Sequence, residues 1–427
     1  MAKIASSGSI RCHVSNRTRE PIALCIDAVF ASHSFTASRS DTSRCFACCC
    51  HGSGKLKCAS AGVEVCFLTA PPACPLKPRS FSRSNRALCC RNGRATLKDG
   101  STFAPFLNGC WTLAGGHGRV DPQQYMQVME RHAEAGFTTF DTADIYGPSE
   151  RVLGAFRASW NAKHPDKPIE IFTKLVPNIF QQRPTKQSVE AAIERSCAAL
   201  GMTTLDMVQL HWWDYSIPGM TDVGKWLAEL KLAGKIKHVA VTNMDCNALQ
   251  QLLDAGVPVV SNQVQFSLLD RRPLNGMVDL CAKHDIKLLT YGTLGGGLLT
   301  DRYVAAPSQG LLGAVRYPPI DLNTSSLKMY YSNVRYGGEK GWRDLLTTLR
   351  TIADSHGVTV AAVSLRWAMD AGKGLVFPIV GMRNDSHMQD NASAFALKLS
   401  ANAHALITEA LRACPGPSGD IYSNERA

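Results

Sequence analysis

GMTTLDMVQLHWWDYSIPGMTDVGKWLAELKLAGKIKHVAVTN, residues 201–243, contains two short apolar runs separated by a segment with helical spacing. The runs are LDMVQLHWW and IKHVAVTN, and the segment between them, from Thr221 to Ala233, places its apolar residues on one face. A strand, a helix and a second strand in this order form a unit whose two strands are parallel. This stretch therefore predicts a parallel sheet covered by helices.

The same alternation continues on both sides of this stretch, from about Ala104 onwards, and amounts to eight strand–helix units. Eight consecutive units with no second kind of domain predict a closed (β/α)8 TIM barrel over residues 96–427. An open doubly wound sheet would need a G-x-G-x-x-G turn after its first strand, where this chain has AGGHGR. The predicted helices are Asp121–Ala135, Ser149–Ser159, Thr185–Leu200, Thr221–Ala233, Asn247–Asp254, Arg272–His284, Trp342–His356, Thr359–Asp370 and Ser386–Leu397.

Residues 1–95 differ in composition from the rest of the chain. They contain 14 Lys and Arg against four Asp and Glu, whereas the remaining residues contain 32 against 31. They also hold eleven of the 16 cysteines, without the paired spacings of zinc sites. A segment rich in Ser, Arg and Ala, poor in acids and without periodicity is typical of an organelle transit peptide. We therefore predict a disordered leader over residues 1–95, directed to the chloroplast, with the mitochondrion as the alternative.

The charge distribution also bears on the partners of the folded domain. A net charge of +11 would favour nucleic-acid binding, but almost all of it lies in the leader, so we expect no nucleic-acid partner. The apolar stretches of the leader are far shorter than the roughly 18 residues of a membrane span, so we expect none. The five cysteines beyond residue 95 are typical of a reduced enzyme. The sequence is compatible with a monomer.

Polar side chains gather where the predicted strands end. Asp141 ends the second strand and Tyr146 follows it, Lys174 ends the third, and His211 ends the fourth. Working residues of such barrels project from the carboxyl ends of the strands, and neighbouring strands lie roughly 5 Å apart. We therefore expect these four side chains to converge on one point.

A phenol, an ammonium, a carboxylate and an imidazole together suit the reduction of a carbonyl group. Negative charge grows on the oxygen as hydride reaches the carbon, and Tyr146 would supply the proton. The unperturbed pKa of a phenol is about 10, so a neighbouring Lys174 cation, held by Asp141, would lower it. His211 would orient and polarise the carbonyl. Each residue alone has a structural explanation, as a cap, a solvated charge or a core histidine.

The motifs FDTADIYGPSERVLG, FTK, QLHWWD, VTNMD, NQVQFS and IVGMRNDSHMQDN, taken in this order, resemble the aldo-keto reductase superfamily over roughly residues 104–412. The resemblance implies that Asp141, Tyr146, Lys174 and His211 are the catalytic tetrad. It also implies NADP(H) as cofactor. Thr242, Asn243 and Gln263 would then bind the nicotinamide carboxamide, and Tyr291 would stack on the nicotinamide ring.

The same resemblance assigns the rest of the coenzyme. Thr293, Leu294 and Gly295 would line the pyrophosphate. Arg383 would grip the 2′-phosphate, as a forked guanidinium does, and Asn391 would lie near the adenine. Arg383 favours NADP(H) over NAD(H), whereas His387 replaces the Arg or Gln of many members. A surface salt bridge is the structural alternative for Arg383.

Aromatic residues surround the predicted mouth of the barrel. Trp111 and Trp212 are the candidate substrate contacts, although consecutive residues face opposite ways, so we expect only one of Trp212 and Trp213 to reach the pocket. Residues 301–340 form a long loop, which we interpret as a lid, with a surface insertion as the alternative.

Together these features predict an NADP(H)-dependent enzyme that reduces a small aldehyde or ketone. Two alternatives use the same residues. One is an NAD(P)+-dependent sugar or polyol dehydrogenase working in the oxidative direction, and the other is a nucleotide-sensing regulatory subunit.

Overall fold

The computed structural model describes residues 94–115, 121–304, 308–309, 315–316, 320–382 and 387–426. All of them belong to one compact unit, Lys77–Ala427. The expected leader lies outside the described residues except for its last two positions, Arg94 and Ala95. Arg383 also lies outside them.

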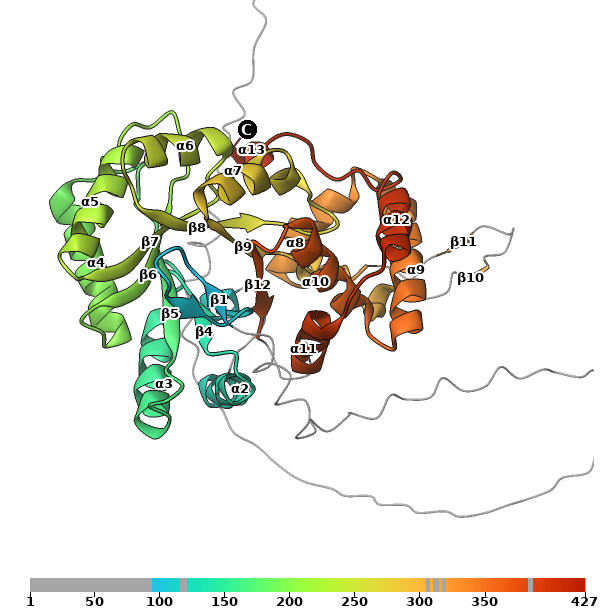
Figure 1. The fold of residues 1–427 in the computed structure, drawn as a ribbon, viewed down its shortest axis with the longest axis horizontal. Coiled ribbons are helices and arrows are strands. Elements are labelled where there is room, and N and C mark those ends of the chain that lie inside the picture. Colours follow the sequence, from blue (N-terminus) through green and yellow to red (C-terminus); the bar gives the residue numbers. More distant parts are fainter. Residues whose placement is uncertain are drawn as a thin grey trace, which may run out of the picture. The chain divides into compact units, whose positions relative to one another are not determined.

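Eight parallel strands close into a barrel, as the sequence predicts (Figure 1). Their order around the barrel is β12-β3-β4-β5-β6-β7-β8-β9, so the last strand pairs with the first. The strands are β3 (Leu107–Gly109), β4 (Thr139–Asp141), β5 (Glu170–Leu175), β6 (Leu205–His211), β7 (Ile236–Thr242), β8 (Val259–Gln265), β9 (Lys287–Tyr291) and β12 (Val376–Gly381).

Helices cover the outside of this barrel, and most begin and end within a few residues of the predicted bounds. The segment expected as one helix from Arg272 is divided into a 3-10 turn, η4 (Arg272–Leu274), and α7. Gly276, at φ 103°, separates the two. The helices are α2 (Pro122–Glu134), α3 (Ser149–Lys163), α4 (Lys186–Leu200), α5 (Met220–Leu232), α6 (Cys246–Asp254), α7 (Met277–His284), α8 (Ser325–Val334), α9 (Gly338–His356), α10 (Val360–Ala371), α11 (Met388–Ala396), α12 (Ala401–Ala410) and α13 (Ser423–Arg426).

A short hairpin, β1 (Ala95–Thr96) and β2 (Thr102–Phe103), closes the amino end of the barrel. The Phe103 ring is buried, with centroids 5.7 Å from Phe172 and 5.1 Å from Phe377. Because aromatic side chains fill this end, the barrel is a packed core that opens only at the carboxyl ends of its strands.

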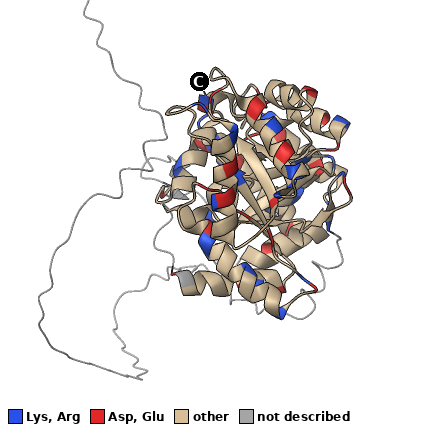
Figure 2. Cartoon of the chain, turned by 90° about the vertical axis from the view of Figure 1, so that its left-hand side faces the viewer, with Lys and Arg blue, Asp and Glu red and all other residues tan. Residues whose placement is uncertain are grey.

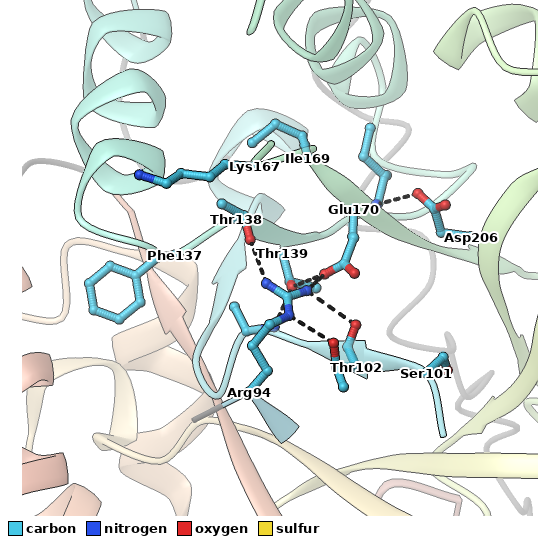
Figure 3. A network of polar contacts seen from close by, with 12 residues as sticks. Arg94, Ser101, Thr102, Phe137, Thr138, Thr139, Lys167, Ile169, Glu170 and Asp206 are labelled. Atoms are coloured by element: carbon cyan, nitrogen blue, oxygen red, sulfur yellow. Dashed lines mark hydrogen bonds and ion pairs between the residues drawn. The ribbon is translucent and has the colours of Figure 1, made fainter. Parts of the chain in front are cut away.

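Arg94 fastens this hairpin to the barrel (Figure 3). Its guanidinium lies 2.5 Å from the Glu170 carboxylate and donates to the Thr138 hydroxyl at 3.2 Å. Thr138 precedes β4 and Glu170 begins β5, so both contacts lie at the amino ends of strands. Arg94 and Ala95, which we expected to belong to the leader, are thus part of the folded domain.

The expected long loop at 301–340 contains regular structure. It includes a 3-10 turn, η6 (Asp301–Tyr303), a hairpin of β10 (Ser308–Gln309) and β11 (Val315–Arg316), and α8. Tyr330 of α8 packs on Gly292, where an added Cβ would lie 2.5 Å from its ring. The helix α8 therefore lies against the turn that follows β9, and its proposed role as a lid stays a prediction.

Positions of Lys and Arg alternate with positions of Asp and Glu along the helices drawn in Figure 2. Within the described ranges, no helix is long and apolar enough to cross a membrane. The described part of the chain also contains no group of acidic, histidine and cysteine side chains arranged to hold a metal ion. All five cysteines beyond residue 95 are free thiols, as expected.

Candidate active site

The side chains of Asp141, Lys174 and His211 meet at the carboxyl end of the barrel. Asp141 and His211 are the last residues of β4 and β6, and Lys174 is next to last in β5, between them. Lys174 Nζ lies 2.7 Å from Asp141 Oδ2 and donates to the Thr142 carbonyl at 2.9 Å. Parallel pairing of the two adjacent strands β4 and β5 thus creates a buried ion pair.

Tyr146 joins this pair from the loop between β4 and α3. The Lys174 ammonium lies 5.1 Å from the centroid of the Tyr146 ring. Burial raises the pKa of Tyr146 above its usual value, and the Lys174 charge opposes that rise. The lysine therefore lowers the phenol pKa as expected, but desolvation is the larger effect.

Lys174 remains a cation in this setting. Burial alone would lower its pKa, but the charge of Asp141 and the Tyr146 phenol together outweigh it and raise the pKa. A protonated amine is thus held against the phenolic oxygen, where it stabilises a phenolate.

Two glutamines position Asp141. Gln209 and Gln263 donate to Asp141 Oδ1 at 2.9 and 2.7 Å, and Gln263 Nε2 also lies 2.7 Å from Gln209 Oε1. Gln263, which we expected at the nicotinamide, contacts the Asp141 carboxylate in the structure. The sequence analysis missed Gln209, although it lies two residues before His211 and so on the same face of β6.

His211 is buried and neutral. Its Nε2 lies 3.4 Å from Asn243 Nδ2, and its ring centroid lies 4.3 Å from that of Trp213. Burial, and then the charges of Arg426 and Lys174, lower the pKa of His211 to about 3. A neutral imidazole has one N–H, so His211 can donate a hydrogen bond without carrying charge.

The residues expected at the nicotinamide lie beside His211. Thr242 is buried, and its Oγ1 has no hydrogen-bond partner. Asn243 adopts the left-handed conformation at φ 55°, and its Oδ1 accepts from the Tyr291 hydroxyl at 2.8 Å. An orphaned buried hydroxyl is costly, so its presence fits a polar ligand such as a carboxamide.

The turn after β9 carries the residues expected at the pyrophosphate. Thr293 is buried and its hydroxyl donates to the Thr290 carbonyl, Leu294 is half-buried, and Gly295 begins a 3-10 turn, η5 (Gly295–Gly297). All three glycines of η5 have positive φ. Because the residues of this turn are glycines, no side chain covers it, and a ligand can approach its backbone closely.

The described residues after β12 include two of the three expected at the adenosine end. His387 is exposed, with Nδ1 4.0 Å from Asp390 Oδ2, and Asn391 is buried in α11. Arg383, the expected 2′-phosphate partner, lies outside the described residues.

Of the aromatic candidates, Trp111 is half-buried and opens the 3-10 turn η3 (Trp111–Ala114) after β3. The expected substrate contact of Trp212 is wrong. Its indole is fully buried in the core, and its Nε1 donates to the carbonyls of Asp214 and Ile217 at 2.8 and 3.2 Å. Its neighbour points the other way, so Trp213 is the residue beside His211.

The segment 416–426 also reaches this end of the barrel, and the sequence analysis missed it. The Tyr422 ring lies edge-on to His211, with centroids 6.1 Å apart, and Arg426 donates to the carbonyls of Trp212, Trp213 and Asn243. Without periodicity or a motif in GPSGDIYSNER, no signal in the sequence predicts this placement.

The sequence profile of the aldo/keto reductase family matches residues 105–412 of this chain. The chain belongs to the aldo-keto reductase family. This finding confirms the resemblance seen in the motifs, and it identifies the chain as a member of a family of oxidoreductases that generally reduce carbonyl groups with NAD(P)H.

Individual relatives of this aldo-keto reductase differ in their named roles. The chain is 29% identical over 324 residues to flagellar radial spoke protein 5 of Chlamydomonas reinhardtii, covering 62% of this chain and 59% of that protein. It is 28% identical over 332 residues to the chloroplastic pyridoxal reductase of Arabidopsis thaliana, covering 74% and 85%. The solved structure of a Gluconobacter oxydans glycerol dehydrogenase superposes with a TM-score of 0.61 at 21% identity, covering 77% of this chain and 98% of that one, and shows the shared fold.

Proposed function

We propose that this aldo-keto reductase reduces an aldehyde or a ketone to an alcohol with NADPH, and that Tyr146 supplies the proton. The observation that carries the proposal is the placement of the Lys174 ammonium, which lies 2.7 Å from the Asp141 carboxylate and 5.1 Å from the centroid of the Tyr146 ring. Packing alone does not require a buried charge beside the phenol, because a neutral pair of side chains would fill the same space at a lower desolvation cost. We therefore assign the charge of Lys174 a chemical task.

Each member of the tetrad has a separate task in the proposed reaction. When bound, the reduced nicotinamide supplies a hydride to the carbonyl carbon. Tyr146 gives its proton to the carbonyl oxygen, and Lys174 stabilises the phenolate that results. Asp141, fixed by Gln209 and Gln263, keeps the lysine charged and in place.

His211 would orient the substrate. Its pKa of about 3 keeps the ring neutral near pH 7, so it donates a hydrogen bond to the carbonyl oxygen and leaves the proton transfer to Tyr146. Trp111 and Trp213 would form aromatic walls on either side of the carbonyl compound.

The coenzyme would occupy the ends of β7, β8, β9 and β12. The orphaned Thr242 hydroxyl, Asn243 and Gln263 suit the carboxamide, and Tyr291 suits the ring. The glycine turn with Thr293, Leu294 and Gly295 suits the pyrophosphate. We propose that Arg383, His387 and Asn391 hold the adenosine end, with Arg383 giving the preference for NADP(H).

The leader would carry the enzyme into an organelle. Its Arg- and Ser-rich, acid-poor composition and the chloroplastic location named for a 28% identical relative support a plastid transit peptide. The mitochondrion remains the alternative destination.

Two alternative functions use the same fold. The glycerol dehydrogenase of the same fold and the reversibility of hydride transfer favour the oxidative reaction on a polyol. The second alternative is a nucleotide-sensing regulatory subunit without a catalytic role. NADPH oxidation with a panel of aldehydes, compared with NADP+ reduction by the matched alcohols, tests the proposal. Aldehyde reduction should be the faster direction near pH 7. Faster alcohol oxidation would favour the polyol dehydrogenase, and the absence of both would favour the non-catalytic role.

A further inference from the structure

Arg426, the last residue of α13, lies across the ends of two barrel strands. Its Nη2 donates to the carbonyls of Trp212 and Asn243 at 3.0 and 2.9 Å, and its Nε donates to the Trp213 carbonyl at 3.1 Å. The guanidinium lies 4.0 Å above the centroid of the Tyr215 ring. These contacts fix the position of the guanidinium through the backbone that follows β6 and β7, so its remaining nitrogen points in a defined direction.

That remaining nitrogen, Arg426 Nη1, is buried and has no hydrogen-bond partner. Within the described part of the chain, no carboxylate forms an ion pair with Arg426. Glu425 pairs with Arg272 at 2.7 Å, Asp245 caps α6, and Asp420 accepts from the first backbone amide of that helix. The hydrogen bonds of these acids are thus made elsewhere, and Asp245 acts on the Arg426 charge only through space, so Nη1 keeps an unused hydrogen-bond donor.

This charge lies close to the catalytic imidazole. The Tyr422 ring contacts both groups, since its centroid lies 6.1 Å from that of His211 and 5.1 Å from the Arg426 guanidinium. Trp213 also links them, through its ring to His211 and through its carbonyl to Arg426. Two aromatic residues, Trp213 and Tyr422, therefore each contact both Arg426 and His211.

The position of Arg426 separates it from the proposed phosphate sites. These belong to β9 and β12, whereas Arg426 contacts residues at the ends of β6 and β7. In the closed order of eight strands, β6 lies directly opposite β12. The proposed phosphate site at β12 thus lies across the barrel mouth from the end of β6, and the one at β9 lies two strands from β7.

We propose that Arg426 is an anion subsite for the substrate, and that the enzyme prefers carbonyl compounds that carry a carboxylate. The inference rests on the proposed reduction of carbonyl compounds at Tyr146. A carboxylate bound to Nη1 satisfies a buried donor that a neutral substrate leaves unpaired. Sites built to hydrogen-bond a charged group reject analogues without it far more strongly than apolar pockets reject a missing methylene.

A pair of isosteric aldehydes tests the subsite. 4-Formylbenzoate and 4-formylbenzamide differ in charge and scarcely in shape. For the full-length enzyme, kcat/KM should be about 10- to 100-fold higher for the benzoate, the range of one charge-assisted hydrogen bond. Arg426→Gln should bring the ratio of the two values to within about threefold of unity. Arg426→Lys, which keeps the charge and loses the fork, should retain part of the preference.

Glu425→Gln is the matched control. It removes the ion pair that fastens α13 to Arg272 but changes no charge next to His211, so the ratio should stay as in the wild type. A loss of preference in Glu425→Gln equal to that in Arg426→Gln would show that the segment acts only by its position. Either that result or an unchanged ratio in Arg426→Gln would overturn the subsite.

Two binding measurements separate this inference from the proposed function. NADPH should bind Arg426→Gln as it binds the wild type, and a comparable loss of NADPH affinity would assign the anion to the coenzyme instead. Calorimetric binding of 4-formylbenzoate needs no turnover. If neither aldehyde is reduced, the proposed function fails. The anion subsite would still be supported if the benzoate binds more strongly than the benzamide and Arg426→Gln removes this difference.

Discussion

The Lys174 ammonium lies 2.7 Å from the Asp141 carboxylate, and only 4% and 6% of the two side chains are exposed. Asp141→Asn would leave a buried cation without its counter-ion, and breaking such a pair costs about 3–5 kcal/mol of stability. We expect this loss in urea unfolding, together with a large loss of activity. Asp279→Asn is the control, because its pair with Lys373 is largely exposed and should contribute little. Equal effects of the two variants would contradict the importance of the buried pair.

Thr242 should bind the coenzyme through the hydroxyl that has no partner in the protein. Thr242→Val keeps the shape and removes the hydroxyl, so the free protein should lose no stability, while the Kd for NADPH should rise about 5- to 10-fold. Thr242→Ser keeps the hydroxyl and should bind NADPH nearly as the wild type does. Fluorescence titration measures both values, and equal affinities for the valine and serine variants would refute the assignment.

The buried His211 should make the enzyme less stable in acid. Its pKa is lowered to about 3 in the folded protein, from about 6.5 in the unfolded chain. Below pH 6.5 the unfolded chain therefore binds a proton that the folded protein does not, so the free energy of unfolding falls as pH falls and is unaffected above. Between about pH 7 and pH 5.5 the wild type should lose roughly 1–1.5 kcal/mol more than His211→Gln. Parallel stability curves for the two proteins would show that the histidine titrates normally.

The hairpin at the amino end should contribute mainly through Phe103. This side chain is 1% exposed between Phe172 and Phe377, and its truncation to Ala should cost about 3–5 kcal/mol. Arg94→Ala removes only partly exposed contacts and should cost much less. Denaturant unfolding measures both, and a larger loss for Arg94→Ala would reverse the roles assigned to the two residues.

The sequence predicted the barrel because each strand and helix has its own periodic pattern, and eight repetitions leave few alternative topologies. It predicted the tetrad because Asp141, Lys174 and His211 stand at strand ends, whose place in a parallel barrel follows from the fold. It could have predicted Gln209 by the same argument, from its spacing to His211.

Other features depend on contacts that leave no pattern. The choice between Trp212 and Trp213 failed because β6 ends at His211, and alternation along a strand does not fix the direction of residues beyond it. Arg426 could not be placed because it binds backbone carbonyls, which every residue provides. The division between η4 and α7 was not predicted for a similar reason. Gly276 has a positive φ, but the apolar pattern of the sequence continues across it.

The central claim is that Tyr146 protonates the carbonyl oxygen, and Tyr146→Phe tests it most directly. Loss of a positioned general acid slows the chemical step by about 100-fold or more, while the ring that remains should leave the Kd for NADPH within about twofold of the wild type. Rapid mixing of the NADPH complex with an aldehyde, followed by the decay of NADPH absorbance, measures that step. With Tyr146 as the general acid, Tyr146→Phe should bind NADPH normally and transfer hydride hardly at all, and hydride transfer within about tenfold of the wild-type rate would contradict this role.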